Sequence, residues 1–365
     1  MAFSNYPSYK KSNKKFNFSI SRELLLNPND VSVGEMIGEG NHSIVYKGLF
    51  RNRVPVAVKI MQPSVKSAVS IMDKKKFQNE VLLLSKMRHA NIVKFVGACI
   101  VPQLAIVTEL MEGGTLQRFM WSSQSKPLDL KKALTFALDI SRAMEFLHSE
   151  GIIHRDLNPA NLLLTGDHKH VKLADFGIAR EENRDGMTGE AGTCKWMAPE
   201  VSSREALRVE EPKHYDHKVD VYSFALVFWE LLNGVEPFPD VPNICVPPLV
   251  QHGERPSLAN TPEEMIPILE LCWAQDSDAR LEFKDIRQLL TSLLTNLTSD
   301  DSIDTLLLSD EEAYDGDIDE DSETPPLSLS QEHCCKVNKP KEKKKKILVK
   351  MMRPFVKMFR ACYKP

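Results

Sequence analysis

The chain has 365 residues, of which 42% are hydrophobic and 27% are charged, a composition that excludes a wholly disordered protein. Its longest uncharged apolar run, Val221–Trp229, is much shorter than the roughly 18 residues of a membrane-spanning helix. The N-terminal residues lack the apolar stretch of a secretory signal. Seven cysteines without a CxxC pair favour neither a disulfide framework nor a zinc ribbon, and they indicate a reducing, intracellular compartment.

The net charge of −3 hides a strong asymmetry towards the C-terminus. Residues 300–323 contain twelve acidic residues and no lysine or arginine, whereas residues 336–364 contain twelve basic residues and one acid. We therefore expect four parts. They are a flexible lead-in (1–30, with an apolar docking segment at 24–26), a folded domain (31–298), an acidic disordered linker (299–335) and a basic amphipathic tail (336–365).

The first third of the folded domain has strand patterns. Between Val54 and Ile60 apolar residues alternate with others, which places Ala57 and Lys59 on the opposite side from the valines. Residues 92–100 and 103–110 indicate two further strands, and the glycines at 113 and 114 end them.

Helical patterns follow these strands and interrupt them once. Residues 74–87 place Phe77, Glu80, Val81 and Leu84 on one helical face, and longer helical patterns cover residues 133–150, 220–234 and 285–297. The fold class predicted is α+β, with a small β-rich lobe that carries one main helix and a larger, mostly helical lobe.

A glycine-rich turn at residues 37–45 stands between two of the predicted strands. Glycines allow backbone amides to approach a phosphate closely, although a GxG pair also occurs in plain tight hairpins. Lys59 is flanked by apolar residues, and Glu80 shares its helical face with Phe77 and Leu84, where a carboxylate needs a partner. A Lys59–Glu80 ion pair is therefore expected.

Two polar clusters follow in the helical lobe. His154-Arg155-Asp156 precedes Asn161 by a short loop, and Asp175-Phe176-Gly177 ends another strand. Carboxylate and amide oxygens on neighbouring loops suit Mg²⁺ that carries nucleotide phosphates. In this arrangement Asp156 accepts a hydroxyl proton, and Asn161 and Asp175 hold the metal.

With Met197-Ala-Pro-Glu200 after them, these motifs resemble those of the protein kinase family over residues 31 to about 297. The resemblance implies a bilobal kinase fold with a small lobe at about 31–107, a hinge at about 108–114 and a large lobe at about 115–298. It also implies ATP bound in the cleft between the lobes, with Mg²⁺ and with Mn²⁺ as the alternative ion.

The resemblance assigns roles to matching positions. Asp156, Lys59, Glu80 and Asn158 form the expected catalytic set, and Asn161 and Asp175 are the expected metal ligands. The expected nucleotide-binding residues are Ile37, Gly38, Glu39, Gly40, Asn41, Val45, Ala57, Lys59, Thr108, Glu109, Met111 and Leu163. A buried Glu200–Arg280 pair is expected to brace the helical lobe, and Asp220 is expected to hold the catalytic loop.

Within the family, residues 192–200 and the segments CWAQDSDAR and DVYSFALVFWEL are similar to the tyrosine-kinase-like branch. The segments GEGNHSIVYKG and GIIHRDLNPANLL are similar to plant Raf-like kinases, often grouped with MAP kinase kinase kinases.

Two positions depart from the family pattern. Ser43 replaces the third loop glycine, and Asn158 replaces a lysine that usually helps to neutralise the γ-phosphate. An amide supplies hydrogen bonds but no charge, so phosphoryl transfer would be weaker or its metal requirement different. Pro159 keeps the serine/threonine-type loop. The expected activity is that of a serine/threonine kinase, with dual specificity left open.

Two threonines are candidate regulatory residues in the presumed activation segment, residues 181–194. A phosphate on Thr188 would pair with Arg155, next to the expected catalytic base. Thr193 is expected to hydrogen-bond the catalytic loop.

The basic tail has three interpretations. It can be a solvated nuclear-import signal, a helix on an anionic membrane, or a helix in a calmodulin-type groove. Cys334 and Cys335 beside it are candidates for acylation, with exposed free thiols as the alternative. The expected location is cytoplasmic, with membrane association or nuclear entry through this tail.

The expected partners are protein substrates, among them a downstream kinase. No specific nucleic acid is expected, because the lysine run lacks interleaved aromatic residues. The alternative function is a weakly active or inactive kinase-fold scaffold that acts through docking.

Overall fold

The computed structural model describes residues 16–40, 43–62, 69–122, 126–181, 193–202 and 215–311, with side chains as far as residue 297. The chain divides into two compact units, residues 1–288 and 289–365. Asn41, Thr188 and the expected tail at 336–365 lie outside the described residues.

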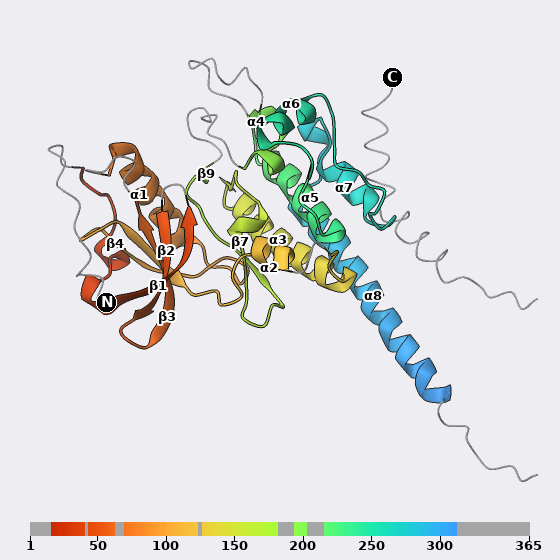
Figure 1. The fold of residues 1–365 in the computed structure, drawn as a ribbon, viewed down its shortest axis with the longest axis horizontal. Helices are drawn as coiled ribbons and strands as arrows, with labels where there is room; N and C mark the ends of the chain where they lie inside the picture. Colours follow the sequence, from red (N-terminus) through yellow and green to blue (C-terminus); the bar gives the residue numbers. More distant parts are fainter. Residues whose placement is uncertain are drawn as a thin grey trace, which may run out of the picture. The chain divides into compact units, whose positions relative to one another are not determined.

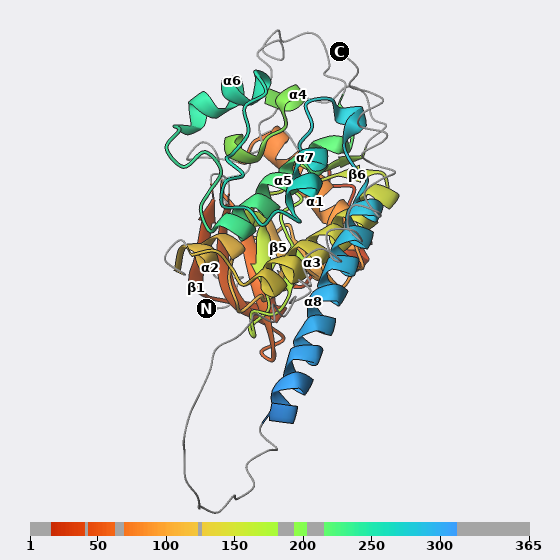
Figure 2. The same cartoon turned by 90° about the vertical axis from the view of Figure 1, so that its right-hand side faces the viewer.

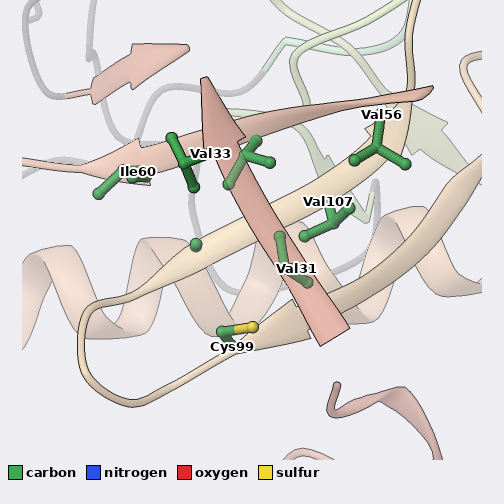
Figure 3. Close-up of a cluster of buried hydrophobic side chains, with 8 residues drawn as sticks. Val31, Val33, Val56, Ile60, Cys99 and Val107 are labelled. Atoms are coloured by element: carbon green, nitrogen blue, oxygen red, sulfur yellow. The ribbon is translucent and has the colours of Figure 1, made fainter. Parts of the chain in front are cut away.

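A five-stranded antiparallel sheet opens the folded domain (Figure 1). Its strands lie in the order β1-β2-β3-β5-β4, where β1 is Val31–Gly40, β2 is Ser43–Phe50, β3 is Val54–Met61, β4 is Phe95–Cys99 and β5 is Ala105–Glu109. Val56 and Val58, predicted to share one side of β3, are fully buried, whereas Ala57 and Lys59 face the other side and are half-buried. Val54, at the start of the strand, is exposed. Figure 3 shows the resulting core, in which Val31, Val56 and Val107 gather from three different strands.

The helices follow the expected order, with one helix before β4 and the others after β5. Helix α1 (Ile71–Lys86) precedes β4. The helices and short strands after the five-stranded sheet are α2 (Leu116–Ser122), α3 (Leu130–Ser149), β6 (Ile152–Ile153), β7 (Leu162–Leu164), β8 (Val171–Leu173), β9 (Arg180–Glu181), α4 (Pro199–Ser202), α5 (Lys218–Asn233), α6 (Val246–Gln251), α7 (Ile266–Cys272) and α8 (Phe283–Glu311). Figure 1 shows α1 with the strands of the sheet, apart from α3 and α5. The predicted α+β architecture of two lobes is confirmed.

Helix α5 is the central helix of the large lobe. Every residue from Lys218 to Leu232 is buried, as expected of a helix that is apolar on all sides. It packs against α3 and α7 (Figures 1 and 2). Gly234 ends it in a left-handed conformation with φ of +73°, and its amide donates to the carbonyl oxygen of Glu230.

The helical lobe also contains the ion pair that the resemblance predicts. The Arg280 guanidinium is 1% exposed and donates to both carboxylate oxygens of Glu200, at 2.6 and 2.9 Å. It also donates to the carbonyl oxygens of Ala274 and Lys218, so its buried charge is surrounded by acceptors.

Two segments differ from the expected domain boundaries. Residues 16–30, predicted as a flexible lead-in with one docking segment, contain two short 3₁₀ helices and make hydrogen bonds to the sheet and to α1. The last helix, predicted over 285–297, continues to Glu311 and so includes the first part of the predicted disordered linker. The leucines at 306–308 favour a helix there, and Ile303 is also apolar. The many acidic residues around them led to the prediction of a disordered linker. In the part of the chain that the structure describes, no helix has the length and apolarity to cross a membrane.

Replacement of Arg280 by alanine should lower the free energy of unfolding by about 3–5 kcal/mol, because the Glu200 carboxylate would lose both charged donors in a partly buried position. Urea unfolding measures this loss. The control is Arg51→Ala, whose ion pair with Asp30 is exposed and should contribute less than about 1 kcal/mol. Equal losses for the two variants would contradict the bracing role.

Candidate active site

A cleft with a volume of about 740 Å³ lies between the sheet and the helical lobe. It is lined by most of the residues that the sequence predicts for nucleotide binding, namely Ile37, Gly38, Glu39, Gly40, Val45, Ala57, Lys59, Thr108, Met111 and Leu163. Glu80, Asn161 and Asp175 line it as well. The cleft thus brings together residues from both lobes that are far apart in the sequence.

Lys59 is the charged group at the centre of the cleft. Its Nζ donates to Glu80 Oε1 at 2.7 Å and to Asp175 Oδ1 at 2.9 Å. Burial alone would lower the pKa of the Lys59 amine, but the two carboxylates outweigh this effect and raise its pKa above the ordinary value. Lys59 is therefore a permanent cation that joins β3, α1 and the loop after β8.

Asp175 has a strained backbone and well-defined contacts. Its φ is +60°, in the left-handed region that few residues other than glycine adopt. Besides Lys59, the amide of Gly177 donates to Asp175 Oδ1 at 3.0 Å. Partial removal from water would raise the pKa of Asp175, but the lysine charge and the Gly177 amide outweigh this effect and lower the pKa below its ordinary value. The carboxylate therefore stays ionised. Its second oxygen, Oδ2, is left for a ligand.

The glycines of the β1–β2 turn fit a bound phosphate. A Cβ added at Gly38 would lie 3.8 Å from the nearest atom, in Val45, and one added at Gly40 would lie 3.7 Å from Ser43 O. These are ordinary contact distances, so the packing of the chain itself does not require glycine at either position. Glycines here instead leave space over the cleft for an anion to approach the backbone amides.

The Glu109 side chain makes its contacts outside the cleft. Its carboxylate accepts from the Lys172 amine and from the Lys94 amide, both at 2.7 Å, and it does not line the cleft. The side chain therefore ties the hinge to β8 behind the cleft. Any contact of Glu109 with adenine is limited to its backbone.

Asp156 sits at the start of the catalytic loop with its two oxygens in different surroundings. Oδ1 accepts from the Thr193 amide at 3.0 Å, from the Thr193 hydroxyl at 3.1 Å and from the Asn158 amide group at 3.0 Å. Oδ2 accepts from Asn161 Nδ2 at 2.9 Å. Because Oδ1 has three donors and Oδ2 has one, Oδ2 retains the capacity to accept a further proton.

Asn158 makes its contacts with the loop that carries Asp156. It is 3% exposed, and its Nδ2 donates to Asp156 and to Thr193 Oγ1, while its Oδ1 accepts from the Ala160 amide. It does not line the cleft. Asn158 therefore orients Asp156 and caps the short helix at 159–161.

The predicted metal ligands lie on adjoining loops. The Ala174 amide donates to the carbonyl oxygen of Asn161 at 2.9 Å, which fixes the loop of Asn161 beside that of Asp175. Asn161 directs its NH₂ group to Asp156, so its Oδ1 is the atom left to face the cleft. Within the described ranges no group of three or more His, Cys, Asp or Glu side chains could hold a metal. Asp175 and Asn161 can supply two oxygen ligands, with phosphate and water oxygens as the others. Such a mixed set of ligands suits Mg²⁺, which is rarely held by protein ligands alone.

Asp220 holds the catalytic loop from below. It is fully buried on α5, and its carboxylate accepts from the backbone amides of His154 and Arg155, both at 2.8 Å. Burial would raise the pKa of Asp220, but His148, His154 and the Arg155 amide together lower its pKa below the ordinary value. The Arg155 amide it binds belongs to a residue with φ of +70°, so Asp220 stabilises a strained loop.

The segment after Thr193 rests on α5 through buried polar contacts. Trp196 Nε1 donates to Glu230 Oε2 at 3.2 Å, and Lys195 donates to Glu236 and to the carbonyl oxygen of Phe238. Burial raises the pKa of the Glu230 carboxyl to about 8. Glu230 is therefore mostly protonated at neutral pH.

Some residues of the cleft were not predicted. Leu84, Val93, Ile106 and Ala174 complete its apolar walls. Their apolar character was visible in the strand and helix patterns, but which of them border the cleft depends on tertiary packing. Arg118 donates to the carbonyl oxygen of Ile37 at 3.1 Å across the mouth of the cleft, and no local pattern signals this contact.

The comparisons with known proteins agree with this geometry. Residues 31–290 match the family described as protein tyrosine and serine/threonine kinase. The chain is 38% identical to serine/threonine-protein kinase STY17 of Arabidopsis thaliana over 275 residues, which cover 74% of this chain and 46% of that protein. It is 38% identical to serine/threonine/tyrosine-protein kinase HT1 of the same plant over 259 residues, or 70% of this chain and 64% of HT1. Tyrosine-protein kinase Fer of Rattus norvegicus is 34% identical over 284 residues, or 76% of this chain and 33% of Fer. The chain thus spans about half the length of STY17.

The raised pKa of Glu230 makes stability depend on pH. Between pH about 4.5, where an unfolded glutamate ionises, and about 8, the unfolded state loses this proton while the folded state keeps it, so this residue costs stability as pH rises. Glu230→Gln keeps an acceptor for Trp196 and removes the titration. Urea unfolding at pH 5 and at pH 8 should show the variant gaining stability relative to the unsubstituted protein as pH rises. A difference that is independent of pH would contradict this assignment.

Proposed function

The chain belongs to the protein tyrosine and serine/threonine kinase family, and we propose that it transfers the γ-phosphate of ATP to serine and threonine hydroxyls of protein substrates. Similarity to STY17 and HT1 confirms the predicted relationship to Raf-like plant kinases of the tyrosine-kinase-like branch. The observation that carries the proposal is the Lys59 amine between Glu80 and Asp175, in a cleft that also contains Asn161 and the glycine-rich turn.

Different residues of the cleft bind the phosphates and the adenine ring of the nucleotide. The Lys59 ammonium, held by two carboxylates, offers a fixed positive charge to the triphosphate. Gly38 and Gly40 of β1 leave room beside the cleft for the phosphates, and Val45, Ala57 and Leu163 form apolar walls for the adenine ring.

Asp175 Oδ2 and Asn161 Oδ1 are the atoms that would hold a divalent cation. We propose Mg²⁺, with Mn²⁺ as the alternative, because both protein ligands are oxygens. When bound, the ion neutralises charge on the transferring phosphoryl group.

Asp156 Oδ2 is the group that we assign to the substrate hydroxyl. It keeps accepting capacity, whereas Thr193 and Asn158 saturate Oδ1 and hold the carboxylate in one orientation. The proton of the hydroxyl passes to Oδ2 as the oxygen attacks the γ-phosphorus, and the bond from that phosphorus to the bridging oxygen breaks to release ADP.

Several finer expectations remain predictions from the sequence. They are a downstream kinase as substrate, a cytoplasmic location, phosphorylation of Thr188, and contact of residues 336–365 with an anionic membrane or a calmodulin-type groove. No described contact favours the scaffold alternative, since Lys59, Glu80, Asn161 and Asp175 line the described cleft and Asp156 accepts a hydrogen bond from Asn161.

Transfer of labelled phosphate from ATP to a mixed-sequence peptide library tests the proposal. Purified full chain with Mg²⁺ or Mn²⁺ should label serine and threonine, and Lys59→Met and Asp175→Asn should each lower the rate on the order of 10²-fold or more. Phosphoamino-acid analysis identifies the acceptor. Labelling of tyrosine alone would refute the serine/threonine assignment, and labelling that persists in both variants would refute the proposed site.

The contacts of Asn158 lead to a separate prediction. Asn158→Ala should lower kcat on the order of tenfold, because Asp156 loses a donor that orients it, and should leave KM for ATP unchanged. Initial-rate kinetics at varied ATP measure both constants. The matched control is Asn233→Ala, which removes an amide bonded to Trp229 and Thr261, distant in sequence from the catalytic loop, and should leave kcat unchanged. A rise in KM for ATP would instead place Asn158 at the nucleotide.

A further inference from the structure

The chain that precedes the kinase domain lies along one edge of the sheet. β4 is an edge strand, and Leu25 pairs with Ala98 of β4 in a parallel bridge, while the Leu26 amide donates to Ala98 O at 2.9 Å. This pairing covers backbone groups that an edge strand otherwise leaves unpaired.

Leu26 anchors the segment through its side chain as well. It packs against the sheet core, and a Cβ added at Gly97 would lie 2.5 Å from Leu26 Cγ. Any larger residue at position 97 would displace Leu26, so β4 has a position shaped to receive this leucine. Residues 25 and 26 therefore bind at a defined position on β4.

The same segment also contacts α1. The ring of Phe18 meets the ring of Phe77 edge to face, with centroids 5.9 Å apart and an interplanar angle of 81°. The Ser19 amide donates to Gln78 Oε1 at 2.7 Å, and Phe16 stacks edge to face on Phe18 at 4.9 Å. The segment from Phe16 to Leu26, here named the N-terminal strap, thus connects β4 to α1.

The point of contact on α1 is close to the residue that pairs with Lys59. Phe77 is fully buried and precedes Glu80 by three residues, so both lie on the face of α1 that is turned to the sheet. Glu80 is 3% exposed, and its carboxylate reaches Lys59 only while α1 stays close to β3. A small outward movement of α1 would separate a buried carboxylate from its cation, which is costly.

We propose that the N-terminal strap positions α1, and that Phe18 acts through Phe77 to hold Glu80 against Lys59. Phe18 is a positioning residue, because it touches the helix and not the nucleotide site. The inference rests on the proposed kinase function for its catalytic consequence, but its structural part concerns α1 alone.

The test compares Phe18→Ala with the unsubstituted full chain. KM for ATP should rise on the order of tenfold, because Lys59 is less well placed when Glu80 moves. Amide hydrogen exchange should become faster in α1 around Phe77–Leu84. A loss of folded protein would lower kcat and leave KM unchanged, so the KM value separates positioning from general stability. Phe18→Tyr, which keeps the ring, should restore both measurements.

Phe50→Ala is the matched control. Phe50 lies on β2 and packs against the same core from the β1–β2 side of the sheet, far from β4 in the strand order. This variant should lose thermal stability without a change in KM for ATP. In a Glu80→Gln background, Phe18→Ala should add no further loss of kcat/KM, because the two changes act through one contact.

Three outcomes would overturn the inference. They are unchanged KM and α1 exchange in Phe18→Ala, equal KM effects in Phe18→Ala and Phe50→Ala, or additive losses with Glu80→Gln. Hydrogen exchange and ATP binding require no phosphoryl transfer. If the unsubstituted chain bound ATP without transferring phosphate, the proposed function would fail while α1 exchange in Phe18→Ala still decided the role of the strap.

Discussion

The active cleft depends on the Lys59 amine and its two carboxylates. Lys59 lies on β3, Glu80 on α1 and Asp175 on the loop after β8, so one cation joins three elements from both lobes. A lysine placed among apolar residues is unfavourable without anions, and the buried Glu80 is equally unfavourable without its cation. Each partner therefore holds the others, and the cleft keeps this arrangement only while β3, α1 and the loop after β8 stay together.

A second set of contacts holds the acceptor side of the cleft. Asp220, from the most buried helix of the large lobe, binds two backbone amides of the catalytic loop, and Asn158 and Thr193 orient Asp156 above it. The strain at Arg155 and Asp175, both with positive φ, is thus paired with strong hydrogen bonds. Asp220 is fully buried and binds two backbone amides, so it ties the loop of Asp156 to the core of the large lobe.

Much of this site could be predicted because its signals are local in the sequence. Alternation along residues 54–60 separates Lys59 from the buried valines, and helical spacing places Glu80 with Phe77 and Leu84. Asp156 and Asn161 belong to one short loop, and Asp175 directly follows a strand. In each case the residue type and its spacing limit the side chain to one face or one loop, whatever the rest of the chain does.

Sequence alone thus determined the α+β class, the two lobes and the presence of Lys59, Glu80 and Asp175 in one cleft. Tertiary structure decided where their hydrogen bonds go. The Glu109 side chain binds Lys172, and Asn158 binds Asp156 and Thr193. The segment predicted to dock at residues 24–26 packs on β4, and residues 18 and 19 of the predicted flexible lead-in pack on α1 as well. These outcomes depend on which donors and rings arrive from distant segments, and a periodic pattern reports which face a residue occupies but not the partner it meets there.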